Sequence, residues 1–86
     1  MTDNTHAKTL EINRANDIAR LATAHDRVTR CRRRLDVSMA TIKRELDRDK
    51  LDGREVSYAF RTHRSDVEAL ERAWISLEEA QRRARS

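Results

Sequence analysis

Residues 50–56 read KLDGREV and contain Gly53, the single glycine of an 86-residue chain that has no proline. Asp52 and Glu55 have the D-x-x-E spacing of a capping box, which satisfies free backbone N–H groups at the start of a helix. Gly53 could instead end a preceding helix in the left-handed conformation that glycine adopts easily. Both interpretations end one helix near Lys50, place a turn there and start a second helix near Gly53.

Downstream of the turn, mostly apolar residues recur at alternating steps of four and three, which is the spacing of a coiled-coil seam. This row predicts an unbroken helix over about 53–85. Its members are Val56, Phe60, His63, Val67, Leu70, Trp74, Leu77, Gln81 and Ala84. Beside the row stand Ala59, Ala73 and Ala80, which could admit another helix at close range or simply favour helix formation.

Upstream of the turn, a second apolar row predicts a helix over about 9–50. Leu21, Val28, Leu35 and Ile42 recur every seven residues, and they are accompanied by Ala24 and Cys31 and then, one position later, by Met39 and Leu46. Ile18 and Ala22 widen this stripe. A wide stripe favours a helix that touches more than one neighbour.

These patterns predict an all-α fold, a long antiparallel two-helix hairpin with a turn at about 51–53. Residues 1–8 are expected to fray, which leaves residues 9–86 as a single helical domain. Because one hairpin covers neither stripe fully, we expect two hairpins to pair as a homodimeric four-helix bundle. The predicted core of hairpin and dimer comprises Leu21, Val28, Leu35, Ile42, Phe60, Val67, Leu70, Trp74 and Leu77.

The composition restricts the class of protein further. Charged residues make up 40% of the chain and hydrophobic residues 37%, with a net charge of +4. No stretch of about 18 apolar residues occurs, so the sequence predicts no membrane span, and we expect a cytoplasmic location.

Arginine is concentrated in the first predicted helix. Arg20, Arg27 and Arg34 recur every seven residues, and Arg30 and Arg33 stand beside them. Such a stripe could follow a phosphate backbone or select another partner. The alternative is a solvated face with helix ion pairs, since acidic residues stand four positions from several of these arginines.

The residue types needed for catalysis or metal binding do not come together in the sequence. His6, His25 and His63 are too far apart for a metal pair on one helix, and Cys31 is the single cysteine. We therefore expect no enzyme activity, metal or cofactor. His63 could be a titrating switch, a register-setting polar residue or a half-buried side chain, and Cys31 a reduced core residue or an intersubunit disulfide.

Together these features predict a non-enzymatic interaction, adaptor or regulatory protein that self-associates. We expect it to bind a macromolecular partner through its helix surfaces, and we expect that partner to be a protein. A small Arg-rich chain of this kind would suit a phage or mobile-element accessory factor. The alternative is a small basic regulator that binds nucleic acid through the arginine stripe of the first helix.

Overall fold

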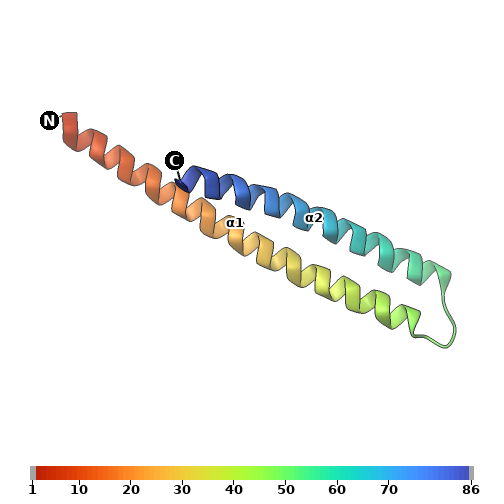
Figure 1. Ribbon diagram of the computed structural model, residues 1–86. Coiled ribbons are helices and arrows are strands. Elements are labelled where there is room, and N and C mark those ends of the chain that lie inside the picture. The colour runs from red at the N-terminus through yellow and green to blue at the C-terminus, as the bar shows by residue number, and fades with distance from the viewer. Residues whose placement is uncertain (1, 86) are drawn as a thin grey trace.

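The computed structural model describes the backbone of residues 2–85 and the side chains of residues 5–85. It consists of two α-helices, α1 (Thr2–Leu46) and α2 (Gly53–Arg85), and this part of the chain forms no strand. The prediction of an all-α protein with two long helices is confirmed. α2 runs back alongside α1, and the amino-terminal part of α1 extends beyond the end of α2 (Figure 1).

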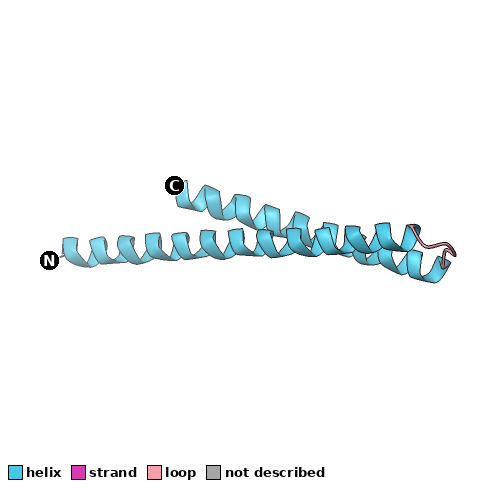
Figure 2. Ribbon diagram, turned by 90° about the horizontal axis from the view of Figure 1, so that it is seen from below, coloured by secondary structure: helices cyan, strands magenta, loops and turns pink. Residues whose placement is uncertain are grey.

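The molecule is a thin rod. Its principal extents are 76 × 16 × 13 Å and its Cα radius of gyration is 20.5 Å, whereas a compact domain of this length would have a radius of about 12 Å. The views in Figures 1 and 2 show two helix axes that are inclined to each other and form a single layer. Side chains that do not point at the neighbouring helix therefore lie at the surface.

α1 extends closer to the amino terminus than the sequence predicts. Fraying is expected over residues 1–8, but α1 begins at Thr2, and residue 1 lies outside the described part. Neither glycine nor proline interrupts this stretch, so the backbone hydrogen bonds continue without support from α2. Leu10 and Ile12 are exposed on this projecting segment.

The carboxyl end of α1 also differs from the prediction. α1 ends at Leu46 instead of near residue 50, and residues 47–52 connect it to α2. Asp47 and Asp49 follow the helix directly. Aspartate is a poor helix former, and its charge is unfavourable beside the negative end of the helix dipole, which explains the earlier end and the longer loop.

Asp52 caps the amino end of α2. Its Oδ1 atom accepts hydrogen bonds from the backbone N–H groups of Arg54, at 3.0 Å, and Glu55, at 3.5 Å. Gly53 is the first residue of α2, and no described glycine has a positive φ. The interpretation of Gly53 as a left-handed cap of the first helix is therefore wrong. Glu55 lies in the first turn of α2, where its negative charge interacts favourably with the positive end of the helix dipole.

The two helices meet along one row of residues from each, which we call the seam. Each row consists of buried or half-buried side chains at alternating steps of three and four. The seam comprises Leu21, Ala24, Val28, Cys31, Leu35, Ser38, Ile42 and Glu45 on α1, and Val56, Ala59, His63, Asp66, Leu70, Ala73, Leu77 and Ala80 on α2.

The seam of α2 shares Val56, His63, Leu70 and Leu77 with the predicted row, but at the alternate positions the residue before each predicted one lies in the seam. Phe60 and Trp74 are 46% and 52% exposed, whereas Ala73 is 0% exposed. Val67 is half-buried. Small alanine side chains let the backbone of α1 approach closely, and the bulky residues that follow them are displaced to the side. Phe60 and Trp74 therefore lie outside the contact between the helices, contrary to the prediction.

A similar shift occurs near the turn on α1. Ser38 and Glu45 are buried in the seam, at 4% and 5% exposure, while Met39 and Leu46 are 42% and 48% exposed. In contrast, Leu21 and Leu35 are half-buried and Val28 and Ile42 buried, within the seam as predicted from their sevenfold spacing.

The seam is apolar near the open end of the rod and polar near the turn. Ala24, Val28, Cys31, Ala73, Leu77 and Ala80 form the core cluster, with Leu21, Ala69 and Leu70 packed against it. Nearer the turn, the Ser38 hydroxyl donates to the Leu35 carbonyl at 3.1 Å and lies 2.9 Å from Nδ1 of His63. His63 is half-buried beside this hydrogen bond.

Candidate functional site

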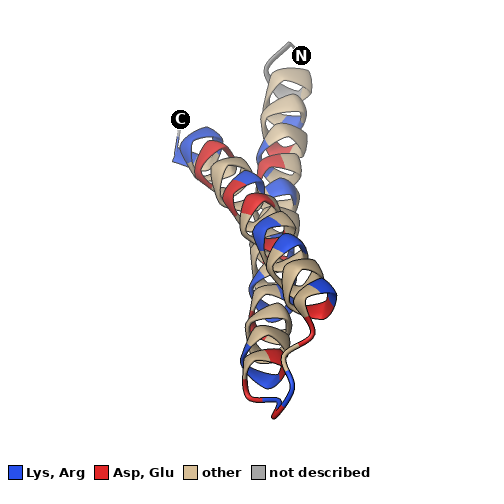
Figure 3. Ribbon diagram, turned by 90° about the vertical axis from the view of Figure 1, so that its right-hand side faces the viewer, with Lys and Arg blue, Asp and Glu red and all other residues tan. Residues whose placement is uncertain are grey.

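The rod has two contrasting sides, one on each flank of the seam. We call one side the apolar face; its residues follow a seam residue directly in the sequence and are Met39, Leu46, Phe60, Val67 and Trp74. We call the other the arginine face; it carries Arg20, Arg27, Arg30 and Arg34 of α1 and Arg72 and Arg83 of α2. Figure 3 shows basic and acidic residues along both helices, so the net charge alone does not define either side.

The residues of the apolar face keep the same position relative to the seam along the whole of α2. Phe60 follows the buried Ala59, and Trp74 follows the buried Ala73. Because the seam itself repeats every seven residues, Phe60, Val67 and Trp74 share one side of α2. These side chains form an exposed apolar row about 20 Å long.

Towards the open end, a groove of about 860 Å³ lies on this face between the helices. Its apolar lining includes Val28 and Leu35 of α1 and Val67, Leu70, Trp74, Ile75 and Leu77 of α2, with His25, Arg32, Asp36 and Glu71 among the polar residues around it. The Trp74 indole N–H donates to Oε1 of Glu78 at 2.8 Å. The tryptophan is thus oriented by a hydrogen bond while half of its surface remains exposed.

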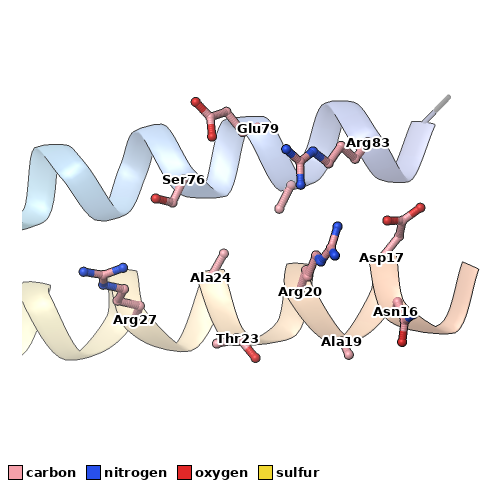
Figure 4. A pocket seen from close by; sticks show the side chains of 11 residues that line it. Asn16, Asp17, Ala19, Arg20, Thr23, Ala24, Arg27, Ser76, Glu79 and Arg83 are labelled. Carbon is pink, nitrogen blue, oxygen red and sulfur yellow. The ribbon is translucent and has the colours of Figure 1, made fainter. Parts of the chain in front are cut away.

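The arginine face is hollowed by a groove of about 610 Å³ near the open end, shown in Figure 4. Arg20 points from α1 towards α2, the Arg83 side chain lies along α2, and Asp17 lies at the same end of the groove. Arg27 and Glu79 also line this groove. Because both signs of charge are present, this part of the face is suited to internal ion pairs as much as to an anionic ligand.

Further along the same face, four arginines surround a smaller groove of about 320 Å³. They are Arg27, Arg30 and Arg34 of α1 and Arg72 of α2, and only Cys31 and Ala69 complete the lining, so this groove has no acidic residue. We call it the four-arginine groove. Cys31 has a free, buried thiol in the seam beneath it.

The four guanidinium groups differ in their existing partners. Arg30 Nε lies 3.2 Å from Oδ2 of Asp26, in a pair in which both side chains are about two-thirds exposed. Within the described residues, no ion pair is formed by Arg27, Arg34 or Arg72. An exposed pair contributes little to stability, about 0–1 kcal/mol. The groove therefore concentrates positive charge that the fold itself does not use.

The structure separates the five arginines predicted from the sequence. Arg20 lies towards the open end, beside Arg27. Arg33 lines a different depression together with Tyr58 and Asp66, so it does not join the four-arginine groove. Arg72 was not predicted, because only the antiparallel register brings it beside Arg30 and Arg34. The predicted hairpin already implied this neighbour, because folding the helices antiparallel about a turn at 51–53 places Arg72 at about the height of Arg30.

Two further properties describe what these surfaces can do. Over the described residues, no group of three His, Cys, Asp or Glu side chains could hold a metal ion. Within the described residues, neither helix contains a segment that is long and apolar enough to cross a membrane. The surface features described above are an apolar row and a cluster of arginine side chains.

Comparisons with protein-family models, with curated proteins and with solved structures find no match to this chain.

Proposed function

We propose that this protein is a non-enzymatic helical interaction protein that self-associates through its apolar face and binds a protein partner through its remaining helix surface. The antiparallel hairpin would be the folding unit, and two hairpins would form a homodimeric four-helix bundle. The observation that supports this proposal is the exposure of Phe60, Trp74, Met39 and Leu46 on one side of a rod that is only one layer thick.

Exposed apolar side chains of this size favour association. Burying apolar surface contributes about 25 cal/mol per Å², and a tryptophan or phenylalanine presents on the order of 150–250 Å². Half of Trp74 and nearly half of Phe60 remain to be covered, at 52% and 46% exposure. Contiguous apolar patches of this kind mark interaction sites on soluble proteins.

Self-association leaves the other face available. If a second copy covers the apolar face, the arginine face points outward on both copies, and its cations can select a partner. The protein would then act by bridging, occlusion or adaptor activity, because a dimer presents two equivalent binding surfaces. This arrangement assigns different tasks to the two flanks of one seam.

Sedimentation equilibrium on matched variants tests the proposal. Trp74→Glu places a charge on the apolar face, whereas Arg72→Glu introduces the same residue two positions away, on the arginine face. We expect the wild type and Arg72→Glu to form dimers of the 10.1 kDa chain, and Trp74→Glu to remain a helical monomer. A monomeric wild type, or a Trp74→Glu dimer as tight as the wild type, would contradict the proposal.

A second candidate function, nucleic-acid binding, is favoured by the four-arginine groove. Arginine forms forked contacts with phosphate, and the groove unites cations of both helices without an acidic neighbour in its lining. A labelled duplex RNA titrated with Arg34→Glu and with Arg61→Glu, which carry equal charge changes, tests it. Selective loss with Arg34→Glu and a steep salt dependence of the wild type would support this function; equal behaviour of both variants would contradict it.

A further inference from the structure

The apolar face of α2 has a symmetric order of side chains. Phe60 and Trp74 stand seven residues on either side of Val67, and the charged residues Arg64 and Glu71 stand between these apolar positions. Reversing the direction of α2 about Val67 exchanges Phe60 with Trp74 and brings Arg64 within one residue, about 1.5 Å along the helix axis, of the height of Glu71. The pattern is therefore complementary to itself in the antiparallel sense.

We propose that a second copy of this chain covers the apolar face by laying its α2 antiparallel against α2, with the two-fold axis at Val67. This inference rests on the proposed self-association and specifies its geometry. Phe60 then packs against Trp74 of the second copy, and Val67 meets Val67. Arg64 lies opposite Glu71 of the second copy, and the symmetry repeats that ion pair.

Parallel pairing of the same two helices gives a poorer match. It would place Arg64 beside Arg64 and Glu71 beside Glu71 of the second copy, and like charges at an interface disfavour association. The antiparallel arrangement replaces two repulsive contacts by two attractive ones. Charge complementarity thus selects both the occupant of the face and its direction.

α1 supports the same site from the side. The contact of 2.9 Å between Ser38 and His63 shows that these two residues lie at the same height along the rod. Phe60, one turn before His63, therefore falls between Met39 and Leu46 in height. These two side chains are exposed beside it. Together they extend the surface that receives Trp74 of the second copy, and methionine sulfur packs favourably against aromatic rings.

The division of labour along α2 agrees with this arrangement. Ala59, Ala73 and Ala80 are buried against α1, while Phe60 and Trp74 stand one position after two of them and are exposed. Small residues on one flank bring α1 close, and large residues on the next flank remain for a helix that approaches from another direction. One helix thus carries two distinct packing rows.

A charge-reversal cycle tests the direction of pairing. Arg64→Glu and Glu71→Arg each replace both ion pairs of the dimer by like-charge contacts, so we expect each to raise the dimer dissociation constant about tenfold. Combining the two substitutions restores opposite charges, and the dissociation constant should return to the wild-type value. Circular dichroism monitors helicity in every variant. If neither single variant dimerises more weakly than the wild type, as parallel pairing would predict, or if the double variant is weaker than both single variants, antiparallel pairing at this site is refuted.

Cysteine cross-linking provides an independent measurement that does not depend on affinity. In a Cys31→Ala background, Val67→Cys should give a disulfide-linked dimer under mild oxidation, because the two-fold axis brings the two sulfur atoms together. Ser65→Cys, two residues away, serves as the matched control and should remain unlinked. A dimer in which Val67→Cys does not cross-link would overturn the inference but leave self-association intact, whereas a monomeric wild type would overturn both.

Discussion

The apolar face and the arginine face flank the same seam, yet their chemistry differs. On α2, Trp74 is half exposed although it adjoins Ala73, which is completely buried. On α1, Arg34 borders a groove of four cations, and the neighbouring Leu35 lines the apolar groove on the opposite side. A shift of one residue along a helix therefore decides whether a side chain is buried in the seam or exposed on one of the two faces. The comparison teaches that helical phase, more than composition, determines which side chains are exposed in a single-layer rod.

The largest expected effect separates the seam from both faces. Leu77→Asp buries an unpaired carboxylate in the core cluster, and we expect it to lower the free energy of unfolding by about 3–5 kcal/mol. Ile75→Asp, on an exposed position two residues earlier, serves as the control and should keep the helices intact. Thermal unfolding monitored by circular dichroism measures both. Equal melting temperatures for the two variants would show that Leu77 is not in the seam.

A smaller effect distinguishes the observed seam from the row of large residues next to it. Ala73→Leu adds side-chain volume where none is available, so it should lower the free energy of unfolding by about 1–3 kcal/mol. Val67→Leu adds one methylene at the half-buried edge and should change this free energy far less. Urea unfolding of both variants gives the comparison. Stabilisation by Ala73→Leu would place Ala73 outside the seam.

Charge reversal on the arginine face should leave the fold nearly unchanged. Each replacement of Arg27, Arg30 or Arg34 by Glu lowers the net charge by 2. The triple variant therefore has a net charge of −2 instead of +4. Exposed substitutions alter stability by about 0.5 kcal/mol or less. We expect earlier elution from a heparin column with an unchanged dimer mass. The triple variant of Arg44, Arg54 and Arg61 has the same net charge and should elute later; identical elution would show that the arginine face has no special role.

The turn serves both faces equally, so a substitution there should affect stability alone. Asp52→Ala removes the acceptor for two backbone N–H groups of α2 and should cost about 1 kcal/mol. Asp52→Asn retains a capping oxygen and should cost less. Both variants should keep the dimer and the heparin elution of the wild type. A change in either property would mean that the turn contributes to one of the two surfaces.

The helices and the site were predictable to different degrees. The turn at Asp52 depends on local capping chemistry, and the two long helices depend on hydrophobic spacing and the absence of proline, so both can be predicted from neighbouring residues. Neighbouring residues alone do not predict which row of α2 faces α1. Ala73 and Trp74 belong to adjacent apolar rows, and hydrophobicity favours tryptophan for the core, whereas close packing of two helices favours alanine.

The arginine cluster illustrates a second limit. Arg27, Arg30 and Arg34 lie within two turns of one helix, so their proximity follows from helical geometry alone. Arg72 joins them only through the antiparallel register, and Arg33 leaves them because it points towards another depression. Local spacing predicts which residues share a helix face, but the neighbouring helix determines which of them form a site.

The fluorescence of Trp74 tests the central claim most directly, because it is the single tryptophan of the chain and lies on the apolar face. Emission is recorded over a dilution series together with the mass measured by light scattering. Covering of the apolar face by a second copy predicts blue-shifted emission in the dimer and a shift to longer wavelength on dilution, at the concentration where the mass halves. A dimer whose Trp74 emission stays at long wavelength and does not change on dilution would contradict the account.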